Sequence, residues 1–199
     1  MSEFDARARG WDKDKMHMDR SVAIAHSLEE MIPLDGAMKV LEYGAGTGIL
    51  SFLLKDRFAD ITLMDSSQEM INVCIEKAEH HQASHLHPLW FDLEHQAFDG
   101  TFDLIYNQMV LHHVNDYQAL IQTFYAMLNP GGYLAIADLY TEDGSFHEPD
   151  VLVHLGFDPE KLSEIFSNAG FIHIEYKTCF EIKRDSGHTY PVFLLVGKK

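Results

Sequence analysis

The segment Val40-Leu41-Glu42-Tyr43-Gly44-Ala45-Gly46-Thr47-Gly48 decides the fold of this 199-residue chain. An apolar run that ends in a carboxylate leads into three glycines at alternate positions, and a helix-forming stretch follows. Glycine accepts positive φ angles and carries no side chain, so such a loop lets the backbone approach a ligand closely. The free amide groups at a helix start are also suited to binding an anion. The pattern therefore predicts a strand, a tight turn and a helix that together form a ligand-binding loop.

Strand-like apolar stretches alternate with helical patterns along the rest of the chain, which predicts a mostly parallel sheet with helices on both faces. The expected strands are residues 39–43, 61–65, 87–92, 102–107, 133–139, 172–184 and 190–197. A turn at Asp185-Ser186-Gly187 joins the last two as a hairpin, so the final strand should run antiparallel to the others. We therefore expect a Rossmann-like α/β fold with a seven-stranded sheet. Because no repeat or linker interrupts the chain, residues 1–199 should form a single domain.

Three helices have recognisable start and stop signals. The capping box Ser66-Ser67-Gln68-Glu69 should begin one of them. A second is expected to begin at Asn115 and to stop at Asn129-Pro130-Gly131-Gly132. A third should begin at Asp158-Pro159 and end before Gly170.

The charge balance narrows the class of partner. The chain has 15 Lys and Arg against 31 Asp and Glu, a formal charge of −16. A field of this sign repels phosphate backbones, so we expect no nucleic-acid partner but a small molecule or a basic site on another protein. Acidity that serves only solubility is the alternative.

Other features of the composition bear on where the protein resides. The longest apolar runs are only strand-length, so no membrane span is expected. The N-terminus lacks the apolar core of a signal peptide. Cys74 and Cys179 form no disulfide framework, which indicates reduced thiols and a cytoplasmic protein.

The glycine loop with its preceding Glu42 resembles motif I of class I S-adenosylmethionine-dependent methyltransferases. The resemblance covers roughly residues 38–199, and the motifs follow in the order of the family, most similar to its small-molecule, ubiquinone-biosynthesis-like members. The dinucleotide pattern G-x-G-x-x-G would require a glycine where Ile49 stands, which disfavours an NAD-dependent oxidoreductase. The resemblance implies S-adenosylmethionine as the methyl donor and S-adenosylhomocysteine as the product.

The resemblance also implies a set of cofactor-binding residues. The loop would lie under the methionine part of the donor, and Asp65, at the end of the second strand, would bind the ribose. From its position alone, Asp65 could instead serve only as an anion at a helix start. Side chains and amides after the next strands would surround the adenine and the methionine. The full set is Glu42, Gly44, Ala45, Gly46, Gly48, Asp65, Ser66, Met70, Asp92, Leu93 and Asn107.

No motif identifies a catalytic base. His112 follows the fourth strand, and Asp138 and Tyr140 stand at the end of the fifth, so these three residues are the candidates. A base is needed only if the acceptor arrives protonated, because the sulfonium donor carries most of the reactivity. The resemblance also permits a structural role for His112 and its neighbour His113.

The remaining expectations concern metals and the acceptor. Histidines 80, 81, 85, 87 and 95 match no zinc-binding pattern, and we expect no metal. Residues 1–32 should form an N-terminal helical lid, and residues 140–157 an insert on the acceptor side. The predicted function is methyl transfer to a small-molecule acceptor by in-line displacement. The alternative is a non-catalytic domain that binds S-adenosylmethionine or S-adenosylhomocysteine as a regulator or partner.

Overall fold

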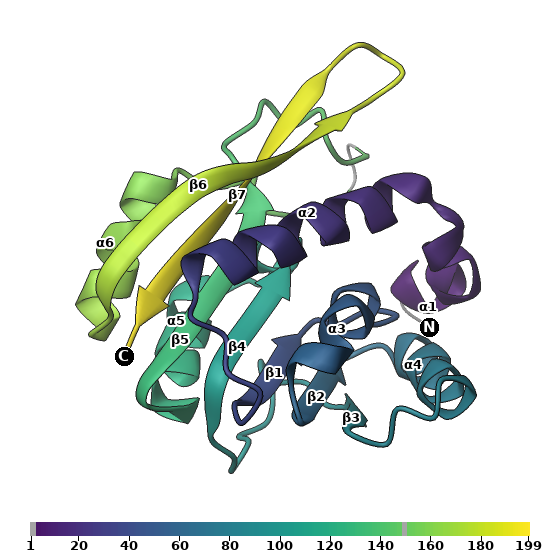
Figure 1. Ribbon diagram of the computed structural model, residues 1–199. Helices are drawn as coiled ribbons and strands as arrows, with labels where there is room; N and C mark the ends of the chain where they lie inside the picture. Colours follow the sequence, from purple (N-terminus) through teal and green to yellow (C-terminus); the bar gives the residue numbers. More distant parts are fainter. Residues whose placement is uncertain (1–2, 149–150) are drawn as a thin grey trace.

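The computed structural model describes residues 3–148 and 151–199. A seven-stranded sheet runs through the molecule in the order β3-β2-β1-β4-β5-β7-β6, and helices cover both of its faces (Figure 1). The strands are β1 (Lys39–Tyr43), β2 (Asp60–Asp65), β3 (Leu86–Trp90), β4 (Phe102–Gln108), β5 (Leu128–Leu139), β6 (Ile172–Lys183) and β7 (Thr189–Lys198). The helices and 3-10 turns are α1 (Glu3–Arg7), η1 (Ala8–Lys13), α2 (Lys15–Met31), α3 (Ile49–Leu54), η2 (Lys55–Arg57), α4 (Gln68–His80), η3 (Leu111–His113), α5 (Tyr117–Met127) and α6 (Pro159–Ala169).

The strand directions confirm the predicted fold. Strands β1 to β5 pair in parallel, whereas β7 runs antiparallel to both β5 and β6. The terminal hairpin turns through Gly187, whose φ of +87° suits a residue without a side chain. This short turn places β7 between β5 and β6, so only the last strand is reversed.

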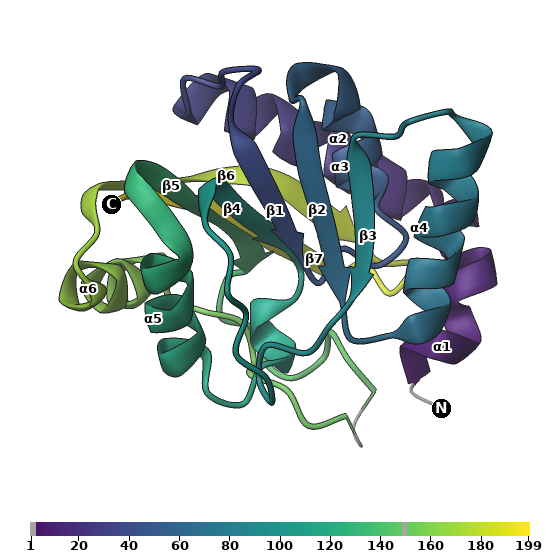
Figure 2. The ribbon, with the colours of Figure 1, turned by 90° about the horizontal axis from the view of Figure 1, so that it is seen from below.

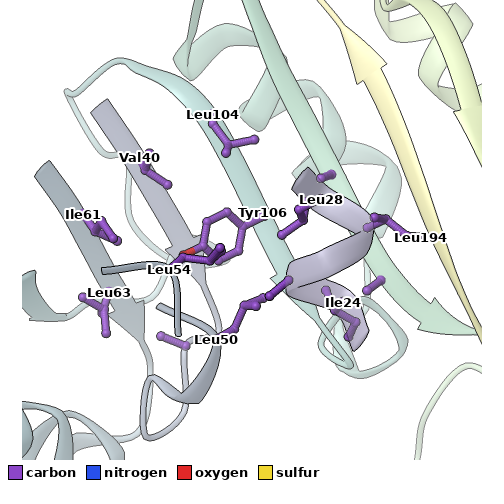
Figure 3. Packing of buried hydrophobic residues seen from close by; sticks show 14 of the residues in the cluster. Ile24, Leu28, Val40, Leu50, Leu54, Ile61, Leu63, Leu104, Tyr106 and Leu194 are labelled. Carbon is purple, nitrogen blue, oxygen red and sulfur yellow. The ribbon is translucent and has the colours of Figure 1, made fainter. Parts of the chain in front are cut away.

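Alternate residues of the central strands belong to two hydrophobic clusters, one on each face of the sheet. Leu104 and Tyr106 of β4 pack with residues of α2 and α3, whereas Ile105 between them packs in the cluster that contains α5 and α6. Figure 2 shows α2 and α3 on one side of the sheet and α5 and α6 on the other. In Figure 3, Leu28 of α2 and Leu54 of α3 point toward the ring of Tyr106. The alternation follows from the two-residue period of a strand, and it buries both faces of the sheet.

Several predicted element boundaries are wrong by a few residues. Helix α4 is capped by Ser67, whose hydroxyl accepts from Met70 N, so the capping box predicted to start at Ser66 lies one residue too early. Helix α5 is capped by Asp116 rather than Asn115. Strand β5 begins at Leu128, because Leu128 pairs with Phe102 ahead of an irregularity in the ladder. The predicted helix stop at residues 129–132 therefore lies inside the strand.

Strand β3 also ends early, at Trp90, so Asp92 lies in the following loop. The signals for α6 are confirmed. Asp158 caps its first turn by accepting from Glu160 N, Pro159 occupies the first position, and Gly170 ends the helix with a φ of +109°. None of the helices in the described part of the chain has the length and apolar composition that a transmembrane helix requires.

Candidate functional site

A cavity of about 400 Å³ lies where β1, β2 and β4 end. Its wall contains parts of the loops after β1 (residues 43–46), β2 (65–66) and β4 (108–114). The N-terminal segment and the loop after β5 also contribute, and Met70, Glu94 and Arg184 complete it. Strand β1 lies between β2 and β4, the position at which the chain order of the sheet reverses. Open α/β sheets bind ligands at the carboxyl ends of the strands at such a reversal point.

The glycine loop forms the floor of this cavity, and its three glycines serve different purposes. All three have positive φ angles, +65° at Gly44, +55° at Gly46 and +77° at Gly48. A Cβ on Gly44 would come within 2.4 Å of Val110, and one on Gly48 within 2.6 Å of Leu63. A Cβ on Gly46 would meet only Met70 Sδ, at 3.9 Å. The open side of the loop is therefore at Gly46, which lines the cavity.

Asp65, at the end of β2, connects the glycine loop to α4. Its carboxylate accepts from Gly46 N at 2.7 Å and from Ser67 N at 2.8 Å. Burial raises the pKa of this carboxyl group. A carboxylate has about four acceptor sites, so two amide bonds leave capacity for a ligand's hydroxyl groups. Asp65, Ser66 and Met70 all line the cavity, as do Gly44, Ala45 and Gly46.

Glu42 lies beneath the loop and does not reach the cavity. Its side chain is fully buried. One carboxylate oxygen accepts hydrogen bonds from Ser51 of α3, from the backbone amide at 3.1 Å and from the side-chain hydroxyl. The other oxygen has no hydrogen-bond partner among the described residues. Burial raises the pKa of Glu42 to about 8. Its contacts are therefore with the helix that follows the loop.

The structure does not bring four other predicted cofactor residues to the cavity wall. Gly48 caps α3 and faces Leu63. Asp92 accepts from Glu94 N at 2.9 Å and bonds the ring of His95 at 2.8 Å, so its carboxylate is engaged within its own loop. The other two, Leu93 and Asn107, are buried in the interior. Glu94 is the acidic residue of this loop that lines the cavity, and sequence reasoning missed it.

Two of the three catalytic candidates form a buried pair. The His112 ring donates through Nδ1 to Asp138 Oδ1 at 2.7 Å, and His112 N donates to Oδ2 at 3.2 Å. His112 also lines the cavity. The third candidate, Tyr140, lies outside the cavity wall, and its hydroxyl bonds Thr178 Oγ1 at 2.9 Å. The structure thus brings His112 and Asp138 together and leaves Tyr140 apart.

Two further histidines surround His112. The ring centroids of His113 and His147 lie 4.2 and 5.0 Å from that of His112. Burial and the neighbouring His112 and His147 lower the pKa of His113 to about 3. His147 lies in the expected acceptor-side insert, residues 140–157, but it was not one of the catalytic or cofactor-binding candidates. No local pattern indicated that it returns to the end of β4.

The N-terminal segment, residues 4–20, closes one side of the cavity with Phe4, Trp11, His17 and Arg20. Asp12 accepts a hydrogen bond from the hydroxyl of Thr47 in the glycine loop. It also accepts one from Lys77 Nζ of α4, at 2.7 Å. Arg20 is buried, and burial lowers its pKa to about 10 against the opposing effect of Asp138. His17 and Arg20 lie within the expected lid, residues 1–32, but sequence reasoning did not single out either residue for the site.

The fold and the position of the cavity agree with comparisons to known proteins. A methyltransferase domain family matches residues 16–174. The chain belongs to the class I S-adenosylmethionine-dependent methyltransferases. This methyltransferase domain is 31% identical to trans-aconitate 2-methyltransferase of Deinococcus radiodurans over 69% of the chain and 52% of that protein. It spans 55%, 30% and 52% of the first three curated relatives that it matches.

Two solved structures share the fold at low sequence identity. One is the methyltransferase of Haloferax volcanii in complex with the Trm112 activator, with a TM-score of 0.77 and 19% identity over 100% of this chain and 98% of that one. The other is the N-methyltransferase NodS of Bradyrhizobium japonicum in complex with S-adenosyl-L-homocysteine, with a TM-score of 0.71 and 20% identity. The match to NodS covers 94% of this chain and 89% of that one. At these identities the likeness shows the fold alone.

Proposed function

We propose that this methyltransferase domain transfers a methyl group from S-adenosylmethionine to a small-molecule acceptor bound in the same cavity. The observation that carries the proposal is the open glycine loop with Asp65 beside it, at the point where the strand order reverses. A cavity of about 400 Å³ suits small ligands. Its wall carries charges of both signs, with Asp65 and Glu94 among the acidic residues and Arg7, Arg20 and Arg184 as the basic ones, which suits a zwitterionic donor.

The residues present fit the donor. At Gly46 the space that a Cβ would enter is open to the cavity, which makes room for an amino-acid tail against bare backbone. We assign Asp65 to the ribose hydroxyls, and Ser66 and Met70 to the adenine side. S-adenosylmethionine supplies an activated methyl group on a positive sulfonium. The protein's part is to align the acceptor with that group and to exclude water, which can account for roughly 7–11 kcal/mol of the barrier.

We assign the role of general base to His112. Because its Nδ1 donates to the Asp138 carboxylate, Nε2 carries the lone pair of the neutral ring. Asp138 acts as a positioning residue that fixes this tautomer. The pair takes the proton of an acceptor that arrives as a phenol, an alcohol or an ammonium ion. An acceptor that arrives deprotonated needs no base.

We further assign the described residues to one methyltransferase domain, with residues 1–32 as its lid and residues 140–157 as its acceptor-side insert. The support is that residues 4–20, residues 146–148 and Val151 contribute to the cavity wall. Residues 1–2 of the expected lid and residues 149–150 of the expected insert lie outside the described part of the chain.

Calorimetric titration with S-adenosylhomocysteine, S-adenosylmethionine and NAD tests the proposal. We expect micromolar binding of the first two and none of NAD. Replacement of Asp65 by Asn should weaken S-adenosylhomocysteine more than tenfold, because a charged acceptor of paired bonds is lost. Asp60→Asn, at the opposite end of β2, is the matched control and should bind normally.

A turnover screen then separates catalysis from binding. Radiolabelled methyl donor is supplied with panels of small carboxylic acids, phenols and amines. Transfer to a member of one panel supports the proposed methyltransferase activity. The variant His112→Asn should then show a lower kcat and an unchanged affinity for S-adenosylhomocysteine. Tight donor binding with no transfer to any panel would instead support the non-catalytic binding domain.

A further inference from the structure

Three histidine side chains converge on one wall of the cavity. His112 and His113 come from η3 after β4, and His147 comes from the loop after β5. One ring nitrogen of each lies within 4.8 Å of those of the other two. We propose that these three imidazoles bind a divalent first-row transition metal ion, with Zn²⁺ the best match, and leave a coordination position open toward the cavity.

His112 is already arranged as a metal ligand. Its Nδ1 donates to Asp138 Oδ1 at 2.7 Å, and both side chains are buried. Asp138 Oδ1 also accepts from Leu139 N at 2.7 Å, which holds the carboxylate in place. Ligating histidines in metalloproteins commonly donate their second ring nitrogen to a carboxylate in this way, because the bond fixes the tautomer and the ring orientation. Nε2 is then the nitrogen available to an ion.

His147 contributes a ring nitrogen that lacks a hydrogen-bond partner. Its Nδ1 is buried and has no hydrogen-bond partner among the described residues. Leaving a buried polar group without a partner is unfavourable, so a ligand for this nitrogen is favoured. The loop that carries His147 is anchored by Glu142, whose carboxylate accepts from Gly144 N at 2.8 Å and from Phe146 N at 3.1 Å. The position of His147 is therefore built into the loop.

The donor set selects the metal. Imidazole nitrogens suit zinc, copper, iron and nickel, whereas Mg²⁺ and Ca²⁺ prefer oxygen ligands. A tetrahedral ion with Zn–N bonds of about 2.1 Å needs nitrogens about 3.4 Å apart, so nitrogens that lie within 4.8 Å of one another must close by up to about 1.4 Å. Three protein ligands with one open position are typical of catalytic rather than structural zinc sites.

The open position faces the cavity that we assign to the acceptor. An ion there would hold an acceptor oxygen or sulfur and lower the pKa of its proton. That use rests on the proposed function, but binding of the ion does not. In this arrangement His112 would act as a ligand in the metal-loaded protein and as a base only in its absence.

Titration of the metal-free protein with Co²⁺ tests the site. Co²⁺ substitutes for zinc, and its visible absorption reports tetrahedral nitrogen coordination. We expect one ion per chain, displaced by Zn²⁺ but not by excess Mg²⁺. His113→Gln and His147→Asn should each weaken binding at least tenfold. The double variant His80→Ala, His81→Ala removes two exposed neighbouring histidines of the α4 end, whose ring centroids lie 5.2 Å apart, and should bind as the unmodified protein does.

The outcomes are distinct. Absence of the tetrahedral spectrum, or full retention of it in both His113→Gln and His147→Asn, would overturn the metal site. Loss only in the double surface variant would also overturn it, since the ion would then be adventitious. S-adenosylhomocysteine titration of the same samples keeps the two proposals apart. Donor binding without metal binding leaves the proposed function intact, whereas metal binding without donor binding leaves only the metal site.

Discussion

At the scale of single residues, Gly46 differs from its neighbours in the loop. Gly44 and Gly48 are required because a Cβ would clash with Val110 or Leu63, so they maintain packing. Gly46 has no such neighbour, and the space above it belongs to the cavity. Its absence of a side chain therefore matters to the ligand rather than to the fold.

Gly46→Ala should separate these effects. The φ of +55° costs a residue with a Cβ about 1–2 kcal/mol of stability. We expect the variant to fold and to bind S-adenosylhomocysteine at least tenfold more weakly in calorimetry. Gly187→Ala carries the same kind of strain at a φ of +87°, in the hairpin turn with no atom within 4 Å, and should lose stability but not affinity. Equal affinity in the two variants would remove Gly46 from the donor site.

Glu42 makes stability depend on pH. Its pKa is about 8 in the folded chain and 4.5 in its ordinary state, because burial opposes the charge. The folded state therefore holds a proton that the unfolded state releases between these values, and stability falls as pH rises from 4.5 to 8. Below 4.5 both states are protonated and the effect vanishes.

Glu42→Gln should remove this dependence, since the amide imitates the protonated acid. In urea unfolding between pH 5 and pH 9, the stability of the variant relative to the unmodified protein should increase with pH. At about 1.4 kcal/mol per pKa unit, the full difference is on the order of 4–5 kcal/mol. Glu79→Gln, an exposed change on α4, is the control. A pH-independent difference would show that Glu42 is ionised in the folded chain.

At the scale of elements, polar contacts hold the N-terminal segment over the glycine loop and α4. Asp12 bonds both Thr47 and Lys77, and Ser67 Oγ at the start of α4 donates to Asp5 at 2.6 Å. Arg9 adds an exposed ion pair with Glu76 of α4. Exposed pairs contribute little individually, so Asp12, which joins the segment to both the glycine loop and α4, is the contact to test.

Asp12→Ala should loosen the lid. We expect faster amide hydrogen exchange in residues 4–20 and several-fold weaker binding of S-adenosylhomocysteine, because the cavity loses one wall. Lys15→Ala removes an exposed pair with Asp19 within α2 and should change neither measurement. If Asp12→Ala leaves both the exchange and the affinity unchanged, other contacts hold the segment in place.

At the scale of the whole molecule, stability comes from the two clusters on the faces of the sheet. Leu28 of α2 is fully buried in the cluster that also contains Tyr106 of β4 and Leu194 of β7 (Figure 3). Buried polar atoms without a hydrogen-bond partner among the described residues lie at Glu42 and Asn107 in the interior and at His147 in the cavity wall. These oppose folding, so the apolar clusters must offset them.

Leu28→Ala should lower the free energy of unfolding by about 2–5 kcal/mol, through lost burial and a residual cavity. Leu53→Ala, on the solvent side of α3 where the side chain is 41% exposed, should cost much less. Chemical denaturation of both variants measures the difference. Similar losses would mean that α2 does not pack on the sheet as described.

Much of this architecture could be predicted because its signals are local. Strand alternation, the positive-φ glycines and the cap of α6 depend on residues within a few positions of one another. The glycine loop and Asp65 follow β1 and β2 directly, so their meeting at the edge of a parallel sheet was foreseeable. The shifted caps at Ser67 and Asp116 show the precision of such signals, about one residue.

The sequence by itself therefore determined the seven-stranded fold, its reversed last strand and the glycine loop that lines the cavity. Only the tertiary structure decided which side chains face that cavity. Asp92 follows a strand as expected, but its carboxylate is taken by His95, and Glu94 reaches the wall instead. His147 and Arg20 arrive from distant loops and helices. Backbone periodicity is set by neighbouring residues, whereas the direction of a loop side chain is set by whatever packs against it from elsewhere in the chain.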